Sequence, residues 1–270
     1  MKRGKEMNKL NELKGFIDRI ADDGLCIAFS GGVDSSLILR IASETGKRVH
    51  AVMFRTSLHP AADEPEARKL AQEMGAQITV MEIDEFSNPD ILKNPVDRCY
   101  LCKKMLFEKL VEFAHENGYK TVADGTNADD HNEYRPGIQA LGELGVVSPL
   151  AELGITKNEV RHFAKELGIR VHNKPSAPCM ATRFPYNTEI TRESLEKVEL
   201  AENYLKQCGL EVCRLRVHSD IARIEVKEED FEKVLINRKN IASELKKIGF
   251  TYITLDIEGF RSGSMDVGLK

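Results

Sequence analysis

The chain has 270 residues, of which 30% are charged and 41% are hydrophobic, a balance that excludes the apolar-poor composition of disordered proteins. Its 39 Lys and Arg and 43 Asp and Glu leave a net charge of -4, which provides no general attraction for nucleic acid. No apolar run approaches the ~20 residues that span a bilayer, and the start lacks the apolar stretch of a signal peptide, so we expect a cytoplasmic protein without membrane or nucleic-acid partners.

The first 170 residues alternate short apolar strands with segments of helical, amphipathic period. This alternation is typical of a doubly wound parallel sheet covered by helices on both faces, and it predicts an α/β domain over residues 1–170. The expected strands are residues 25–30, 49–55, 77–83, 121–124 and 146–149. The expected helices are residues 9–20, 35–45, 64–74, 102–117 and 157–167.

From residue 169 to residue 190 the periodicity fails, and several prolines break the chain into irregular turns, which predicts a cysteine-bearing linker loop over residues 171–190. Beyond it, the expected helices are residues 192–208 and 229–248, and the expected strands are 211–217, 222–227 and 252–257. This αββαβ order predicts a smaller α+β domain with an antiparallel sheet over residues 191–270. We expect that domain to serve substrate binding or assembly into a homo-oligomer.

The first expected strand runs directly into a string of glycines and serines, Ser30-Gly31-Gly32-Val33-Asp34-Ser35-Ser36. Two adjacent glycines let the backbone approach an anion closely, while the amides and the dipole of the following helix point at negative charge. The serines add hydroxyl donors, and Asp34 is placed to hold Mg²⁺ between phosphates. A plain turn with a serine cap is the alternative. The string matches neither G-x-x-x-x-G-K-[ST] nor G-x-G-x-x-G, which excludes those two nucleotide-binding classes.

This string resembles the signature of the pyrophosphate-loop family, and the resemblance covers residues 20–150. Members of that family cleave ATP to AMP and pyrophosphate while they pass the adenylyl group to a carboxylate or amide oxygen. The resemblance implies ATP and Mg²⁺ as cofactors and Asp34 as a catalytic residue. The nucleotide contacts that it implies in this loop are Ser30, Gly31, Gly32, Asp34, Ser35 and Ser36.

A second cluster, residues 124–130, follows the fourth expected strand at its carboxyl end, where open α/β sheets bind ligands. In the pyrophosphate-loop family the equivalent stretch closes over the nucleotide and contributes a metal-binding carboxylate. The resemblance therefore makes Gly125, Thr126 and Asn127 candidates for contact with AMP, and Asp130 a candidate for Mg²⁺. An acidic surface turn is the alternative, because Asp, Asn and Gly favour turns.

Three cysteines form a candidate ligand set: Cys99 and Cys102 at an expected helix start, and Cys179 in the linker loop. The helix start and neighbouring basic residues would lower the pKa of the first two thiols and favour thiolates, which bind soft metals or attack electrophiles. Three thiolates can hold a [4Fe-4S] cluster whose fourth iron lacks a protein ligand and could carry an extra sulfide. Zinc with a water ligand and catalytic thiols without metal are the alternatives.

Four strings, residues 98–103, 124–127, 178–186 and 214–218, extend the resemblance over nearly the whole chain. They resemble the LarE family of ATP-dependent sulfur transferases in nickel-pincer cofactor synthesis, which have the adenine nucleotide alpha hydrolase-like fold. The resemblance implies that carboxylates of pyridinium-3,5-biscarboxylic acid mononucleotide are adenylylated and then become thiocarboxylates. One branch sacrifices the sulfur of a cysteine that matches Cys179. The branch with three cysteines, which this chain resembles, implies a cluster, and we expect an external sulfur donor.

Arg214 and Arg216 alternate along an expected strand, so both guanidinium groups can project from one face and clamp a phosphate. By the resemblance they hold the substrate phosphate or pyrophosphate, assisted by Thr182 and Arg183. Surface ion pairs on a solvated strand are the alternative. Glu199 and Glu202, on an expected helix, suit a second metal and a helix surface equally.

Three other functions fit parts of the pattern. A tRNA thiolase of the same loop class also pairs C-x-x-C with a distant cysteine, but the acidic charge and the lack of a basic, aromatic-rich tail argue against it. An ammonia-dependent amide synthetase would leave the cysteines idle. A nucleotide-binding regulatory module would bind ATP without turnover.

Overall fold

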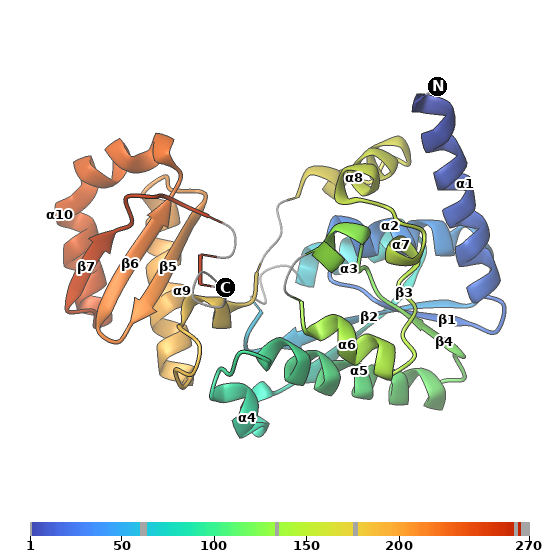
Figure 1. Ribbon diagram of the computed structural model, residues 1–270, viewed down its shortest axis with the longest axis horizontal. Helices are drawn as coiled ribbons and strands as arrows, with labels where there is room; N and C mark the ends of the chain where they lie inside the picture. The colour runs from blue at the N-terminus through green and yellow to red at the C-terminus, as the bar shows by residue number, and fades with distance from the viewer. Residues whose placement is uncertain (1, 60–63, 133–134, 175–177, 262–263, 266–270) are drawn as a thin grey trace. The chain divides into compact units, whose positions relative to one another are not determined.

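Figure 1 shows the computed structural model of the chain, which describes residues 2–59, 64–132, 135–174, 178–261 and 264–265. The chain forms two compact units. The larger unit comprises Met1–Glu85 and Asp97–Ala177, and the smaller unit comprises Phe86–Val96 and Pro178–Lys270. This division differs from the expected one in two ways. The expected linker 171–190 is split between the units after residue 177, and residues 86–96 belong to the smaller unit as well.

The segment Phe86–Val96 belongs to the smaller unit through hydrogen bonds of Asn94. The buried Asn94 side chain donates to the carbonyl oxygens of Phe184 at 3.3 Å and Pro185 at 2.8 Å. Its own carbonyl oxygen accepts from the Asn187 amide at 2.8 Å. Because these partners are far apart in sequence, local periodicity gives no sign of this pairing.

The larger unit is built on a four-stranded parallel sheet of β1 (Leu25–Ala28), β2 (Val49–Thr56), β3 (Gln77–Ile83) and β4 (Thr121–Ala123). The strand order is β3-β2-β1-β4, which confirms the first four expected strands and the parallel sheet. The fifth expected strand is wrong: Val147 forms only an isolated bridge with Ala123. Pro149 instead begins the short helix α7 (Pro149–Glu152), because proline lacks an amide donor and its φ suits the first turn of a helix.

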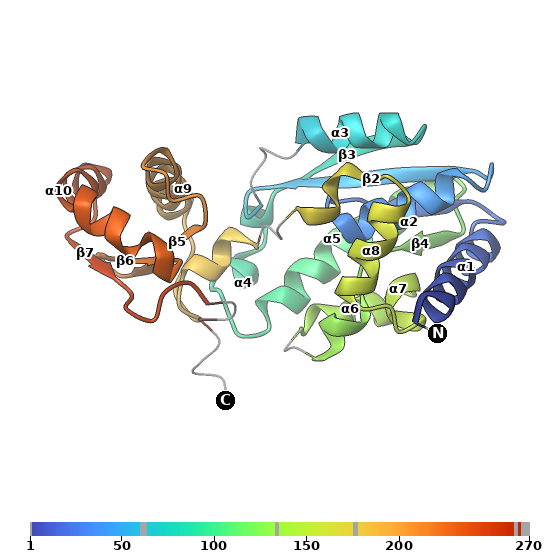
Figure 2. The same cartoon turned by 90° about the horizontal axis from the view of Figure 1, so that it is seen from above.

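Helices cover both faces of this sheet (Figures 1 and 2). One face carries α1 (Lys2–Ile20), α2 (Val33–Ser43), α3 (Glu64–Glu73) and α8 (Lys157–Glu166), and the other carries α5 (Arg98–Glu116) and α6 (Gly137–Glu143). The fully buried side chains of Ile17, Leu37 and Phe163 belong to one apolar core that joins α1, α2 and α8 to β1. The five expected helices are confirmed, although α1 and α5 begin earlier than expected.

The chain order of the sheet fixes where loops from different strands meet. From β1 the chain moves outward to β2 and β3, and it then returns to the opposite side of β1 as β4. The carboxyl ends of β1 and β4 are therefore neighbours at the point where the order reverses, which is where open α/β sheets bind ligands. Both sequence clusters, the string after β1 and residues 124–130 after β4, follow these two strand ends.

The smaller unit contains a three-stranded sheet of β5 (Cys213–His218), β6 (Ile221–Val226) and β7 (Tyr252–Leu255), with helices α4 (Pro89–Leu92), α9 (Arg192–Gln207) and α10 (Phe231–Ile248). The expected antiparallel sheet is wrong in part. Strands β5 and β6 pair antiparallel, but β7 pairs parallel to β6, because α10 carries the chain back to the end where β6 begins. No helix in the described ranges is long and apolar enough to cross a bilayer.

Candidate functional site

The string after β1 forms a tight loop that leads into α2. Gly31 adopts a φ of +69°, and a Cβ atom there would lie 3.0 Å from the Cβ of Ala67, so both the conformation and the close approach require glycine. Gly32 is the N-cap residue of α2, and as a glycine it has no side chain that could accept a hydrogen bond from the amides of the first helical turn. The amides of the first helical turn therefore remain available to an anion.

Two of the three serines in this loop hold its shape through hydrogen bonds. Ser30 Oγ and Ser35 Oγ lie 3.2 Å apart, and the Gly32 amide donates to Ser30 Oγ at 3.3 Å. Ser36 is fully buried, and its hydroxyl has no hydrogen-bond partner within the described part of the chain. Contacts of these hydroxyls with a nucleotide stay a prediction.

The loop after β4 packs directly against the loop after β1. A Cβ atom at Gly125 would lie 3.0 Å from the Ser35 nitrogen and 3.2 Å from the Asp34 Cβ, so any larger residue would push the loops apart. Asn127 Nδ2 donates to Asp34 Oδ1 at 3.2 Å. The structure thus brings together Asp34, Gly125 and Asn127, which the sequence placed in two separate clusters.

Asp124 anchors the base of this second loop. Its carboxylate accepts from Thr126 Oγ1 at 2.5 Å and from Ser148 Oγ at 2.6 Å, and it lies 3.4 Å from Lys103 Nζ. The predicted nucleotide contact Thr126 is buried in this cluster and uses its hydroxyl to hold Asp124. Thr126 therefore supports the loop, and a direct contact with AMP stays a prediction.

Lys157, which the sequence patterns did not single out, forms an ion pair with Asp34. It is the first residue of α8, and its backbone amide donates to Asp129 Oδ2 at 2.8 Å. The helix begins here because Thr156 and Glu159 form a capping box. The Thr-x-x-Glu pattern marks the helix start in the sequence, but only the fold shows that the ammonium reaches the loop after β1.

Asp130, the second predicted Mg²⁺ ligand, has hydrogen-bonding partners on both carboxylate oxygens. Oδ2 accepts from the Asn127 amide at 2.9 Å, and Oδ1 lies 3.1 Å from a guanidinium nitrogen of Arg135. Across the described residues, no group of three or more His, Cys, Asp or Glu side chains is arranged to hold a metal ion. The assignment of Asp34 and Asp130 to Mg²⁺ therefore stays a prediction.

The three candidate cysteines are divided between the two units. Cys99 and Cys102 lie one turn apart at the start of α5 in the larger unit, the first exposed and the second buried. Arg98 Nη2 donates to Cys99 Sγ at 3.3 Å. Cys179 belongs to the smaller unit and is half-buried, immediately before the short 3₁₀ helix Met180–Arg183. A shared cluster of the three thiols stays a prediction.

Two of the remaining cysteines are poor candidates for thiolate chemistry. Burial raises the pKa of the Cys26 thiol to about 12 and that of the Cys213 thiol to about 11, so both stay protonated near neutral pH. Cys26 lies in β1 and Cys213 in β5, and both are fully buried. Setting these two aside leaves Cys208 and the three predicted ligands as candidate thiols.

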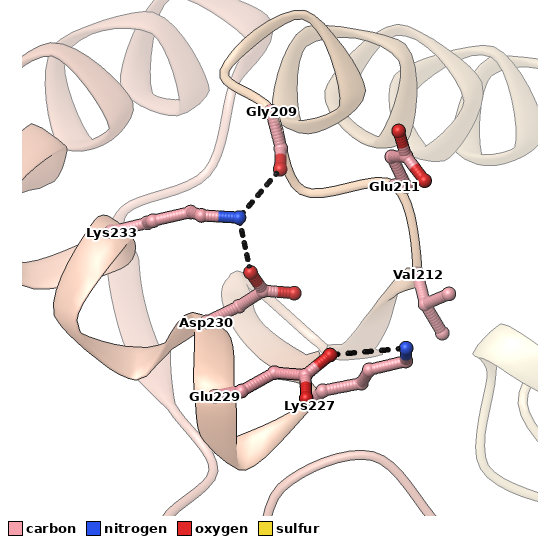
Figure 3. Close-up of a pocket in the computed structure, with 7 residues that line it drawn as sticks. All are labelled: Gly209, Glu211, Val212, Lys227, Glu229, Asp230 and Lys233. Atoms are coloured by element: carbon pink, nitrogen blue, oxygen red, sulfur yellow. Dashed lines mark hydrogen bonds and ion pairs between the residues drawn. The ribbon is translucent and has the colours of Figure 1, made fainter.

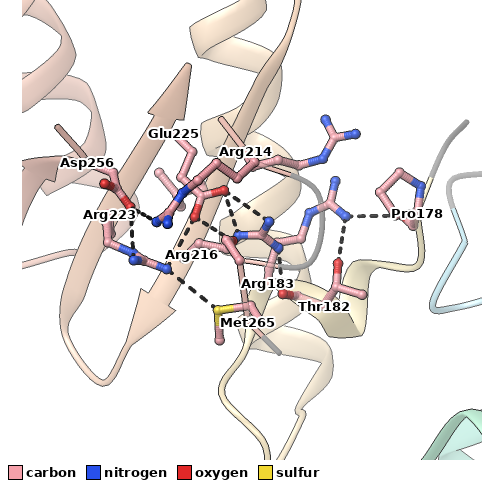
Figure 4. Close-up of polar contacts among 12 residues, drawn as sticks. Pro178, Thr182, Arg183, Arg214, Arg216, Arg223, Glu225, Asp256 and Met265 are labelled. Carbon is pink, nitrogen blue, oxygen red and sulfur yellow. Dashed lines mark hydrogen bonds and ion pairs between the residues drawn. The ribbon is translucent and has the colours of Figure 1, made fainter. Parts of the chain in front are cut away.

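The predicted phosphate-binding arginines lie together in the smaller unit (Figure 4). Arg183 forms a two-pronged pair with Glu202, with Nε and Nη2 at 2.9 and 3.0 Å from the two carboxylate oxygens. Arg216 pairs with Glu225 at 3.0 Å. All four side chains are almost completely buried, so Glu202 does not belong to a helix surface. Arg183 and Arg216 are thus paired within the protein.

Arg214 differs from these two arginines. Its Nη1 donates to the Cys213 carbonyl oxygen at 2.7 Å, and its guanidinium group lies 5.3 Å from the centre of the Phe260 ring. Its Nε has no hydrogen-bond partner among the residues that the structure describes. Arg214 projects from the same face of β5 as Arg216, as the alternation predicted, and it retains donors for a ligand.

A shallow pocket of about 260 Å³ lies elsewhere in the smaller unit (Figure 3). Its lining residues are Gly209, Glu211, Val212, Lys227, Glu229, Asp230 and Lys233. Lys233 Nζ lies 2.6 Å from Asp230 Oδ1, and Lys227 Nζ lies 3.2 Å from Glu229 Oε1, so these charges neutralise each other. None of the predicted site residues lines this pocket.

Comparisons with known proteins place the chain among relatives of similar length. Uncharacterized protein slr1717 of Synechocystis sp. is 40% identical over 263 residues, which are 96% of this chain and 97% of that protein. The pyridinium-3,5-bisthiocarboxylic acid mononucleotide synthase of Lactiplantibacillus plantarum is 39% identical over 242 residues, 89% of this chain and 88% of that protein. NMN synthetase from Francisella tularensis has a TM-score of 0.52 at 16% identity, over 63% of this chain and 75% of that structure, and shares the fold.

A family model described as "Family of unknown function (DUF7411)" matches residues 24–207. That range includes the loop after β1, the loop after β4 and the segment that carries Cys179. Together with the 39% identity to the synthase, these matches confirm the resemblance drawn from the sequence strings. The chain belongs to this family and, within the pyrophosphate-loop enzymes, to the LarE family.

Proposed function

We propose that the chain is an ATP-dependent sulfur transferase that adenylylates a carboxylate of a pyridinium mononucleotide and replaces a carboxylate oxygen with sulfur. The observation that carries the proposal is the junction at Asp34, where the uncapped start of α2, the glycine loop and the Lys157 ammonium come together. The name of the Lactiplantibacillus plantarum relative supports the substrate class.

In the first step, an oxygen of the substrate carboxylate attacks the α-phosphorus of ATP, the bond to the bridging oxygen breaks, and pyrophosphate leaves. The amides at the start of α2 are oriented to bind phosphate oxygens and to stabilise the charge on the departing group. Asp34 has the oxygen donors that Mg²⁺ prefers, and the bound ion would neutralise phosphate charge. Lys157 would then exchange its contact with Asp34 for the phosphates.

In the second step, sulfide attacks the acyl carbon of the adenylate, and AMP is expelled. Iron-sulfur clusters are bound by cysteine sulfur, which Cys99, Cys102 and Cys179 could supply, and Arg98 Nη2 donates a hydrogen bond to Cys99 Sγ. A [4Fe-4S] cluster held by these three thiols would supply the sulfide when bound. Because Cys99 is exposed at the start of α5, a molecule in solution can reach this residue.

Arg214 is the side chain best placed to bind the substrate phosphate in the smaller unit. Of the three predicted arginines, it alone lacks a carboxylate partner within the described residues, and its Nε has no acceptor there. The aromatic ring of Phe260 lies beneath its guanidinium group and leaves the polar edge for an anion. Arg216 would assist by adding positive charge on the same face of β5 as Arg214.

The test is a direct product analysis with ATP, Mg²⁺, the biscarboxylate mononucleotide and a sulfide source. We expect AMP and pyrophosphate in equal amounts, and a thiocarboxylate product seen by mass spectrometry. Cys179→Ala should keep pyrophosphate release and lose thiocarboxylate formation. Release of ADP and orthophosphate would contradict the proposal, and thiolation of tRNA instead of the mononucleotide would favour the tRNA thiolase. Iron and sulfide counting after anaerobic purification tests the cluster.

A further inference from the structure

The peptide groups on both sides of Cys179 are held by hydrogen bonds to a single guanidinium nitrogen. Arg183 Nη1 donates to the carbonyl oxygens of Pro178 and Cys179, each at 3.1 Å. The Cys179 carbonyl oxygen accepts two more hydrogen bonds, from the Thr182 amide at 3.1 Å and from Thr182 Oγ1 at 2.8 Å. Because both flanking peptides are fixed, the backbone dihedrals of Cys179, and with them the direction of its Cα–Cβ bond, are fixed as well.

Arg183 is itself held rigidly by its carboxylate partner. Its two-pronged pair with Glu202 uses Nε and Nη2, and only 3% of Arg183 is exposed. Glu202 Oε1 also accepts from the Leu215 amide at 3.0 Å, which ties the pair to β5. A continuous chain of contacts therefore runs from α9 and β5 through Glu202 and Arg183 to the backbone at Cys179.

A second buried guanidinium group holds the far end of the same segment. Arg216 Nη1 donates to the Thr182 carbonyl oxygen at 2.7 Å, while its Nε bonds to Glu225 at 3.0 Å (Figure 4). Arg183 therefore holds the carbonyl groups at positions 178 and 179, and Arg216 holds the carbonyl group at position 182. A segment held at three carbonyl groups by buried side chains keeps its geometry when a ligand arrives.

We propose that Arg183 is a positioning residue that aims the Cys179 thiol, and that it does not bind the substrate phosphate. This inference rests on the proposed function for the role of Cys179. The donors of Arg183 are already committed: Nε and Nη2 to Glu202, and Nη1 to two carbonyl oxygens and to Thr182 Oγ1 at 3.2 Å. Phosphate binding would have to break these bonds inside a buried site, whereas Arg214 can offer donors without that loss.

The first test replaces Arg183 by Lys, which keeps a cation beside Glu202 but cannot bind two carboxylate oxygens and two carbonyl groups together. We measure alkylation of Cys179 by iodoacetamide with peptide mass spectrometry, with Cys208 as internal reference and with iron content determined in each sample. Release of the segment should raise the Cys179 alkylation rate at least threefold. An unchanged or slower rate overturns the proposal. This readout needs no turnover, so it decides the matter even if the proposed function fails.

Kinetics separate positioning from phosphate binding. In Arg183→Lys we expect kcat for thiocarboxylate formation to fall at least tenfold, while KM for the mononucleotide and the rate of pyrophosphate release change less than twofold. A tenfold rise in KM with unchanged alkylation would identify Arg183 as a phosphate ligand and overturn the proposal. Arg238→Lys is the control in the same unit, because Arg238 donates to the Leu235 carbonyl oxygen at 2.9 Å within α10 and has no contact with the Cys179 segment among the described residues.

A second pair of variants covers the case in which Arg183→Lys fails to fold. Thr182→Val removes the hydroxyl that donates to the Cys179 carbonyl oxygen, and Thr182→Ser keeps it. We expect faster Cys179 alkylation in the Val variant and the wild-type rate in the Ser variant. Equal rates in both variants would show that the hydroxyl does not hold the segment and would overturn the proposed anchoring.

Discussion

The two units build their sites by different physical means. In the larger unit, the junction at Asp34 depends on backbone: a glycine turn, an uncapped helix start and a close approach at Gly125. In the smaller unit, the Cys179 segment depends on side chains, because buried arginine–glutamate pairs hold its carbonyl groups. Glycine strings are visible in a sequence, whereas the partner of a buried guanidinium group is set by the tertiary fold.

This difference has an energetic side as well. The backbone site in the larger unit binds charge with dipoles that need no counterion when the site is empty. The smaller unit instead buries full charges, which are stable only while each has its partner. We therefore expect substitutions in the larger unit to change activity more than stability, and substitutions of paired residues in the smaller unit to change both.

The strongest test of this contrast is Asp34→Ala. Loss of the carboxylate removes the proposed Mg²⁺ ligand and leaves Lys157 without its partner, so pyrophosphate release should fall on the order of 10³-fold. The melting temperature should stay close to that of the wild type. Asp18→Ala, which alters a surface pair with Lys47, is the control and should keep full activity. A variant of Asp34 that retained a tenth of the activity would contradict the assigned role.

The next effect is on stability and concerns Glu225→Ala. This carboxylate is fully buried and pairs with Arg216 and Arg223, so its loss leaves buried positive charge uncompensated. We expect the free energy of unfolding in urea to fall by about 3 kcal/mol. The control is Glu258→Ala, which removes an exposed pair with Arg261 and should cost less than ~1 kcal/mol. Similar losses in both variants would contradict the larger stabilising role assigned to the buried pairs of the smaller unit.

Gly125→Ala tests the backbone contact itself. The added Cβ atom would lie 3.0 Å from the Ser35 nitrogen, so the loops after β1 and β4 must separate. A shift of the neighbouring backbone by a few tenths of an ångström should lower the rate of pyrophosphate release by about tenfold. Gly142→Ala in α6 is the matched control, since a Cβ atom there meets nothing within 4 Å. Full activity in the Gly125 variant would show that the loops tolerate separation.

The smallest expected effect is a pH dependence from Cys26. Its pKa is raised by burial to about 12, so the folded state keeps the proton while the unfolded state loses it near pH 9. The stabilising contribution of the thiol is therefore present below pH 9 and is lost as the pH rises toward 12. Between pH 9 and 10, the stability difference between wild type and Cys26→Ala should shrink by roughly 1 kcal/mol. A difference that stays constant with pH would contradict the shift.

The sequence predicted the parallel sheet, because its strands are continuous apolar runs that end in glycine turns or polar clusters. It also predicted the loop after β1, since Gly31 is needed for a local conformation. It did not predict Lys157, whose ammonium reaches Asp34 from a helix far along the chain. Likewise, the sequence left Glu202 equally suited to a second metal and to a helix surface, because helical spacing cannot show that a buried arginine faces it.

The double passage of the chain through the smaller unit has a practical consequence for dissecting the protein. A fragment that starts at Pro178 would omit Phe86–Val96 and with it Asn94, which supplies donors to the carbonyl groups of Phe184 and Pro185. Those carbonyl groups lie a few residues beyond Cys179, so a simple truncation would damage the segment it was meant to isolate. A faithful fragment would need residues 86–96 fused ahead of position 178 by an engineered connection.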